Sequence, residues 1–146
     1  MGRTSHQNIE QPIGRILSHA GRRFLYLINE DLSSLDIDRN FYSLLLIEQG
    51  EGQITQQDLA GLMGTDKVSI VRTVDYLCDR GYVTRDINSN DKRKYSLQIT
   101  EKAKKYLPQI KKTLKNVTKK AFKGLEPDEI SAFLKTINII KNNLDK

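Results

Sequence analysis

Three basic side chains stand together in one short polar stretch of the chain: Lys92, Arg93 and Lys94. Cations on an extended loop suit a polyanion, because an arginine fits a narrow minor groove of DNA while its neighbours meet phosphates. Asp91, directly before them, would be misplaced against phosphate unless it orients an arginine. We therefore expect Asp91 to brace Arg85 or Arg93. The alternative interpretation is a solvated charged turn.

A second set of side chains with base-reading chemistry lies in a helical pattern over 66–80. Its apolar side chains recur every three or four residues and are expected to face a core: Ile70, Val74 and Leu77. The opposite side carries polar, basic and apolar groups: Lys67, Val68, Ser69, Arg72 and Tyr76. Arginine can bind guanine with two hydrogen bonds, serine can bond a base edge or phosphate, and an apolar group can meet a thymine methyl. The alternative is an ordinary solvated helix face.

The residues before this helix predict another short helix, over 55–63. Thr55 stands three residues ahead of Asp58, which is the spacing of an N-cap and its acidic partner. Gly64 supplies a permissive backbone for the stop, and Thr65 or Asp66 can cap the next start. Two helices joined by so short a turn must cross steeply, as in a helix-turn-helix. Thr55 and Gln56, at the start of the first helix, join the candidate DNA contacts.

Past Gly81 the apolar spacing changes from helical to alternating. Residues 82–85 and 95–99 read as strands, and the Asn-, Asp- and Ser-rich segment 86–94 reads as the loop between them. Ile54 is expected to add a short strand. A helix-turn-helix followed by a hairpin with a basic tip is the outline of a winged helix-turn-helix.

The flanking segments predict four further helices. Two precede the helix-turn-helix, over 9–32 and from Asp36 or Asp38 to Gly50, and two follow the wing, one starting at Thr100 and one at Pro127. Pro108 is expected to kink the helix that starts at Thr100. The first and the last two carry apolar stripes that a small lobe cannot bury, so we expect a two-fold dimer. The expected fold is mainly α (α+β), in one domain. Its parts are a disordered leader over 1–8, dimerisation helices over 9–35 and 101–146, and a DNA-binding lobe over 36–100.

Composition narrows the class of protein. The net charge of +6 fits a polyanionic partner. No apolar run is long enough to span a bilayer and no signal-peptide core is present, so we expect a cytoplasmic protein with no membrane partner. Two histidines and one cysteine offer no metal site, and no catalytic arrangement or cofactor loop is visible. Cys78 is expected to be a small buried hydrophobe; a redox-sensing role is the alternative.

The segment 64–103 resembles the signature of the MarR family of bacterial transcription regulators. It contains the recognition-helix string SIVRTVD, which is most similar to the SlyA-like branch, then RGYVTR, and a wing in which DKR leads into LQITEKA. Lys92 to Tyr95 depart from the usual wing pattern, which has Arg and a small residue after the Asp. The positions that match the family are Ser69, Arg72, Leu77, Arg80, Gly81, Arg85, Asp91, Arg93 and Thr100.

The resemblance implies a homodimer that reads a pseudo-palindromic operator in double-stranded DNA, most often as a repressor. It also implies release by a small phenolic or anionic effector bound between the lobes, for which His19 and Arg23 are the candidate contacts. For His19 the alternative is a partly buried or dimer-interface histidine. Nine lysines between 102 and 123 form either a solvated face or a lining for an anionic effector. The alternative function is a weakly specific architectural DNA-binding protein.

Overall fold

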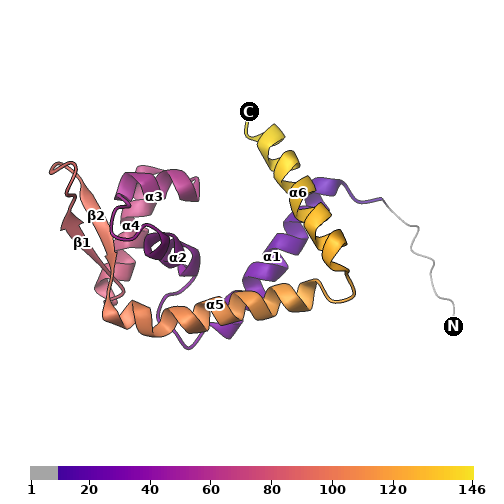
Figure 1. Cartoon of the computed structure of the whole chain (residues 1–146), viewed down its shortest axis with the longest axis horizontal. Coiled ribbons are helices and arrows are strands. Elements are labelled where there is room, and N and C mark those ends of the chain that lie inside the picture. The colour runs from indigo at the N-terminus through magenta and orange to yellow at the C-terminus, as the bar shows by residue number, and fades with distance from the viewer. Residues whose placement is uncertain (1–9) are drawn as a thin grey trace.

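A computed structural model describes residues 10–146, and the predicted leader over 1–8 lies outside them. The described part consists of six helices and a two-stranded antiparallel sheet (Figure 1). In chain order these are α1 (Ile13–Asp31), α2 (Phe41–Gln49), α3 (Gln56–Met63), α4 (Lys67–Asp79), β1 (Val83–Ile87), β2 (Tyr95–Ile99), α5 (Glu101–Ala121) and α6 (Pro127–Leu144). The expected mainly α winged helix-turn-helix is confirmed.

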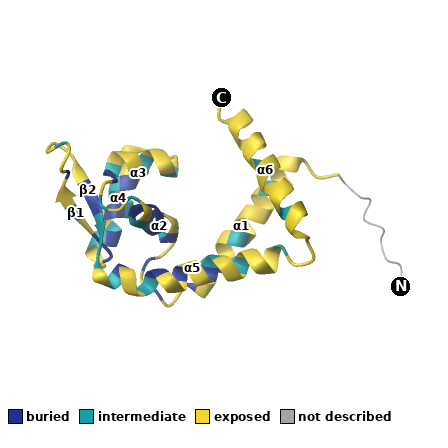
Figure 2. Cartoon of the chain, in the orientation of Figure 1, coloured by how far each residue is buried: buried dark blue, intermediate teal, exposed yellow. Residues whose placement is uncertain are grey.

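One apolar core lies beneath the helix-turn-helix and the wing. Figure 2 shows the buried residues gathered around α2, α4, the strands and the first half of α5. The end of α1 and the following turn also contribute to it, so the core joins segments from most of the chain. Its most completely buried side chains are Tyr82, Leu32, Ile37, Leu44, Ile47, Leu59, Ile70, Leu77, Leu97, Ile110, Val74 and Val83.

Three helices begin at the side-chain caps that local spacing predicts. Thr55 accepts a hydrogen bond from the amide of Asp58, whose carboxylate accepts one from the amide of Thr55, which closes the capping box of α3. Asp66 caps α4 and Thr100 caps α5 in the same way, through the amides three residues on. Gly64 ends α3 with a φ of 62° in the left-handed region that glycine tolerates.

The start of α2 differs from the sequence-based expectation. Its N-cap is Asn40, without a side-chain cap bond, so the proposal that Asp36 or Asp38 caps it is wrong. The chain makes several turns between α1 and α2, which place Asp36 too early for the helix. Its carboxylate instead accepts hydrogen bonds from Tyr82 and Lys102, while Asp38 adopts a φ of 51°.

The wing is a hairpin whose strands pair in the register Val83↔Ile99 to Ile87↔Tyr95. Strand β1 extends two residues further than the expected 82–85, because it continues to Ile87. In place of the expected strand at Ile54, a single bridge pairs Thr55 with Ser96, and beside it the amide of Leu97 donates to the carbonyl of Ile54 at 2.9 Å. This bridge joins the start of α3 to the wing.

Helices α1 and α6 and the far half of α5 extend away from the core (Figures 1 and 2). α5 is one helix through Pro108, and α6 has no buried residue. Within residues 10–146 no helix has both the length and the apolarity to cross a membrane. Exposed apolar side chains on α1 and α6 include Ile13, Ile16, Leu25, Tyr26, Phe133, Leu134, Ile139, Ile140 and Leu144.

Candidate nucleic-acid interface

The first turns of α4 present a mixed set of side chains to solvent. Lys67, Val68, Ser69 and Arg72 are exposed, and the side chain of Val68 remains 62% exposed although it is apolar. Tyr76, one turn further on, is half-buried under the guanidinium of Arg80, 3.8 Å from its ring centre. The buried positions Ile70, Val74 and Leu77 hold the opposite side of α4 on the core. The predicted division of α4 into a core face and an exposed face is therefore confirmed.

The exposed end of α4 is ordered by its cap. The amide of Ser69 donates to Oδ1 of Asp66 at 2.7 Å, and its hydroxyl donates to Oδ2 at 2.8 Å. The backbone hydrogen bond from Ser69 holds the pKa of the Asp66 carboxyl below its usual value. With its proton donated to Asp66, the Ser69 hydroxyl keeps only acceptor capacity for a base edge. The cap thus fixes the turn that carries the reading side chains.

The wing tip carries an arginine braced by an aspartate. The backbone amide, Nε and Nη2 of Arg93 all donate to the carboxylate of Asp91, at 3.0 to 3.1 Å. These bonds from Arg93 hold the pKa of Asp91 below its usual value. The Arg93 side chain is nevertheless 89% exposed, so it is oriented without being covered. The expectation that Asp91 braces Arg93 is confirmed.

Asn88 orders the same loop, and the sequence-based search did not single it out. Its side chain is buried, with Oδ1 accepting from the amides of Asn90 and Asp91 at 2.9 Å. Its Nδ2 donates to the hydroxyl of Ser96 across the hairpin at 2.6 Å. An asparagine at the start of a polar loop is a known turn former, and this signal was present in the sequence.

Arg85 lies away from the wing tip, so the alternative that Asp91 braces Arg85 is wrong. It pairs with Leu97 across the hairpin, on the face that packs against the helices. Its guanidinium donates to Asp75 of α4 at 2.6 Å and to Gln56 of α3 at 3.2 Å. Arg85 therefore fastens the wing to both helices of the helix-turn-helix.

Comparisons with a protein-family model and with solved structures both find similarity to MarR-type transcriptional regulators. A sequence model of the MarR family matches residues 39–95. A MarR transcriptional regulator from Methanosarcina mazei Go1 is 26% identical and aligns over 91% of this chain and 96% of its own, with a TM-score of 0.80. The transcriptional regulator SlyA, at 23% identity, aligns over 92% and 94% with a TM-score of 0.84. The chain therefore has the fold of these MarR and SlyA regulators, and its residues 39–95 match the model of the MarR family.

One similar structure includes nucleic acid. A cysteine-to-serine mutant of MarR from E. coli, complexed with operator DNA, is 27% identical and aligns over 88% of this chain and 93% of its own, with a TM-score of 0.79. This chain thus has the fold of DNA-binding transcriptional regulators.

Within this MarR fold, two predicted DNA contacts have structural partners of their own. Thr55 is buried, and its hydroxyl serves the cap of α3. Gln56 accepts the hydrogen bond from Arg85. Lys92 and Lys94 are exposed on either side of Arg93 at the wing tip. The structure thus brings the contacts predicted in the first turns of α4 and on the wing tip to the surface and leaves Tyr76 half-buried. It assigns supporting bonds to the contacts predicted at the start of α3.

The candidate effector residues line an open cleft of about 670 Å³ along α1 and the turn that follows it. His19 and Arg23 lie in its wall with Arg22 and Arg39, and the guanidinium of Arg23 stands 5.0 Å over the ring of Tyr26. Cys78 is half-buried, and burial raises the pKa of its thiol, which disfavours the reactive thiolate. Across residues 10–146 no group of three or more His, Cys, Asp or Glu side chains could hold a metal ion.

Proposed function

We propose that two copies of this chain form a sequence-specific repressor that reads a pseudo-palindromic operator. Each copy places α4 in a major groove and the tip of its wing in the adjacent minor groove. Within the MarR family we place it in the SlyA-like branch, because of the string SIVRTVD, and in the bacterial cytoplasm. The proposal excludes the architectural alternative, for which base-reading side chains would be unimportant.

One observation carries the DNA-reading part of the proposal. Arg85 links the wing to α3 and α4, so the exposed side chains of α4 and the braced Arg93 belong to one rigid unit. Arg72 is exposed and takes part in no ion pair among residues 10–146, which leaves its guanidinium free for a guanine. Arg93 is oriented by Asp91 before any DNA is bound, which lowers the entropy lost on entering a minor groove.

The dimer rests on the apolar surface of α1 and α6. α6 presents Phe133, Leu134 and Ile140 to solvent and buries nothing in a single chain. A helix with such a stripe needs a partner surface, and a second copy related by a two-fold axis supplies one. Two recognition helices related by that axis read half-sites roughly 10 base pairs apart. A dimer on such a site blocks polymerase where the site overlaps a promoter.

The cleft beside α1 supports control by a small phenolic or carboxylate effector. His19, Arg22, Arg23 and Arg39 supply cationic or hydrogen-bonding groups, and Tyr26 supplies an aromatic wall. An anion bound there would contact α1 and the turn that leads to α2, and so could favour one placement of the DNA-binding lobe over another.

The test measures the oligomeric state of the chain and its effect on transcription from an operator-containing promoter. Analytical ultracentrifugation of the full chain should give a dimer at micromolar concentration. Transcription from a promoter that overlaps the operator should fall when the dimer is added, and salicylate, as a phenolic carboxylate probe, should restore it less well with Arg23→Gln than with wild type. A monomer at all concentrations, or repression of promoters with and without the operator alike, would contradict the proposal.

A further inference from the structure

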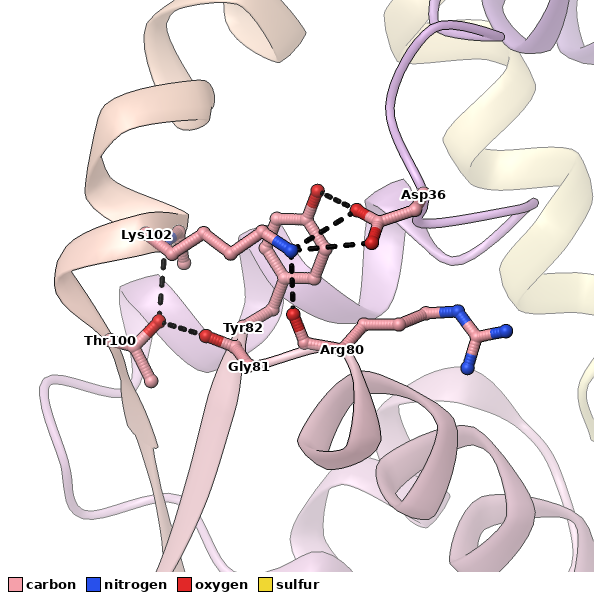
Figure 3. A network of polar contacts seen from close by, with 7 residues as sticks. Asp36, Arg80, Gly81, Tyr82, Thr100 and Lys102 are labelled. Atoms are coloured by element: carbon pink, nitrogen blue, oxygen red, sulfur yellow. Dashed lines mark hydrogen bonds and ion pairs between the residues drawn. The ribbon is translucent and has the colours of Figure 1, made fainter.

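A network of polar contacts joins the C-terminal end of α4 to α5 and to the turn between α1 and α2 (Figure 3). Its centre is Lys102, in the first turn of α5. The Nζ of Lys102 donates to the backbone carbonyl of Arg80 at 2.6 Å and to the carboxylate of Asp36 at 3.2 Å. The hydroxyl of Tyr82 donates to the same carboxylate at 2.5 Å. We call Lys102, Asp36, Tyr82 and the Arg80 carbonyl the junction network.

The Lys102 ammonium is positioned from several sides. It stands 4.3 Å from the ring centre of Tyr82, which is itself buried, with 1% of its surface exposed. Arg80 is the C-cap of α4, so its carbonyl lies at the negative end of that helix dipole, where a cation is stabilised. Beside it, the hydroxyl of Thr100, the N-cap of α5, donates to the carbonyl of Gly81. The end of α4 is therefore capped by side chains from the start of α5.

The contacts on the other side of the network belong to the segments outside the helix-turn-helix. Asp36 lies in the turn after α1, and α1 is tied to α5 by the hydrogen bond from the hydroxyl of Thr113 to Asp31. A further ion pair, between Lys111 and Glu48, ties α5 to α2. The junction network thus lies where α5 and the turn after α1 meet the end of the recognition helix.

A small rotation at this junction has a large effect at the other end of α4. The helix has 13 residues, and at 1.5 Å per residue it is about 20 Å long. A tilt of about 10° about its C-terminal end would move its N-terminal end by about 3.5 Å, which is close to the roughly 3.4 Å rise of one base pair. The reading side chains Lys67, Val68 and Ser69 stand at that N-terminal end.

Packing of Ile70, Val74 and Leu77 on the apolar core sets the orientation of α4 only to within the scatter of such packing, since the attraction itself is non-directional. Hydrogen bonds do depend on direction, and Lys102 makes them to two separate segments at once. The cation and its carboxylate are partly exposed, at 38% and 53% of their side chains, so their contribution to folding stability is small. The Lys102–Asp36 pair therefore acts through the direction of its hydrogen bonds rather than through folding stability.

We propose that Lys102 is a positioning residue for operator recognition: with Asp36 and Tyr82 it holds α4 at a fixed angle to α5 and so sets the separation of the two recognition helices. This inference rests on the proposed dimeric function. When one recognition helix is bound and the second half-site lies at the matching distance, the second helix binds it at a high effective concentration. A dimer whose DNA-binding lobes are not held in place has a lower effective concentration and loses this gain in affinity. Lys102 therefore governs which half-site spacing the dimer accepts, without contacting a base.

The test uses the full-length chain and the operator that wild-type protein selects from random DNA. Three duplexes carry the two half-sites with the selected spacer or with one base pair more or less, and a fourth carries a single half-site. Lys102→Met removes the hydrogen bonds and keeps an apolar stem over Tyr82. Lys112→Met removes the same charge from an exposed position of α5 and is the matched control. Tyr82→Phe removes only the hydroxyl bonded to Asp36, and circular dichroism confirms that each variant is folded.

Wild type and Lys112→Met should prefer the selected spacer by roughly tenfold or more, as for one mismatched base pair. Lys102→Met should reduce this preference to below roughly threefold through weaker binding to the selected spacer, with half-site affinity changed by less than about twofold. Tyr82→Phe should move in the same direction by a smaller amount. Asp36→Asn combined with Lys102→Met should broaden the preference no more than Lys102→Met alone.

Two results would overturn the inference. One is an unchanged spacing preference in Lys102→Met; the other is an equal loss of affinity on all four duplexes, which would make Lys102 a DNA contact or a general stabiliser. A wild-type protein with no spacing preference would instead contradict the dimeric reader, and the inference with it.

Discussion

Nη2 of Arg85 donates to Oδ1 of Asp75 across 2.6 Å, and this contact joins strand β1 of the wing to the recognition helix α4. The two side chains are 28% and 53% exposed, so the pair contributes about 1 kcal/mol or less to folding. The pair instead fixes the position of the wing relative to α4, and this position matters because the wing tip and the exposed face of α4 must contact neighbouring grooves of one duplex. A second bond from Arg85, to Gln56, holds α3 in the same arrangement.

Asp75→Ala should release the wing from α4 while leaving every proposed base contact in place. We expect the free energy of operator binding to become less favourable by roughly 1 kcal/mol, which is about fivefold in affinity. The reason is that a released wing must be ordered when DNA binds, and this costs conformational entropy. Asp86→Ala, an exposed aspartate of the same wing, is the control. Fluorescence anisotropy with a labelled operator measures the change; an affinity equal to that of the control would show that the wing needs no such fastening.

Arg72→Ala should cost roughly 1–3 kcal/mol on the cognate operator and relax its sequence preference at one position in each half-site. Arg39→Ala, an exposed arginine of the effector cleft and outside the proposed DNA interface, is the matched control when no effector is present. Competition between cognate and scrambled duplexes at one salt concentration gives the ratio. An equal loss on both duplexes would refute base reading by Arg72.

Arg93→Ala should weaken operator binding and reduce the preference for A/T-rich flanks, because a narrow minor groove attracts a guanidinium most strongly. Asp91→Ala should have a smaller effect of the same sign, since it leaves the guanidinium present but no longer held at 3.0 Å. Hydroxyl-radical footprinting shows whether the flanks are covered. Footprint edges that are identical with and without Arg93 would mean that the wing does not reach the groove.

The stability of the chain should depend on acid through Asp36. The hydrogen bond from Tyr82 and the charge of Lys102 lower the pKa of Asp36 from its ordinary 3.8. The folded chain therefore holds this proton less tightly than the unfolded chain, and the stabilisation is complete above pH 3.8 and lost as the pH falls through the folded pKa. Asp36→Asn should be less stable than wild type at neutral pH, with the two converging as the pH falls below 3.8 and through the lowered pKa of Asp36.

Urea unfolding at a series of pH values measures this convergence, with Asp86→Asn as a control for the loss of one carboxylate. Curves for wild type and Asp36→Asn that stay parallel down to acid pH would contradict the assigned role of the Asp36 carboxylate.

Removal of residues 127–146 should abolish the soluble dimer, because α6 carries much of the exposed apolar surface. Ile140→Lys should weaken the dimer in a chain of full length, whereas Asn142→Lys, on the opposite side of the helix, should not. Sedimentation equilibrium gives the association constants. A truncated chain that remains a well-behaved monomer, or equal effects of the two lysines, would place the dimer contact elsewhere.

The helix starts were predictable because a cap is a local signal. Thr55 with Asp58, Asp66 and Thr100 each lie within three residues of the amide that they bind. The same reasoning failed at Asp36, whose partners Tyr82 and Lys102 lie 46 and 66 residues away. An aspartate before a helix offers the same local pattern in both cases, and only the packed chain decides which donors reach it.

The exposed residues of the candidate site were predictable from the sequence, whereas most of the contacts that join its helices and strands were not. The exposed face of α4 follows from helical spacing, and the brace of Asp91 on Arg93 follows from adjacency. Alternation along β1 could have shown that Arg85 faces the helices together with Val83, which is buried. The junction network was not predictable, because it requires the turn after α1, the end of α4 and the start of α5 to meet.

Selection of bound fragments from a random DNA pool, with the mass of the protein checked alongside, tests the central claim most directly. A dimeric sequence-specific reader should enrich a short pseudo-palindrome whose half-sites lie about 10 base pairs apart. Failure to enrich any motif, with salt-sensitive binding to every fragment, would contradict that account and favour an architectural DNA-binding protein.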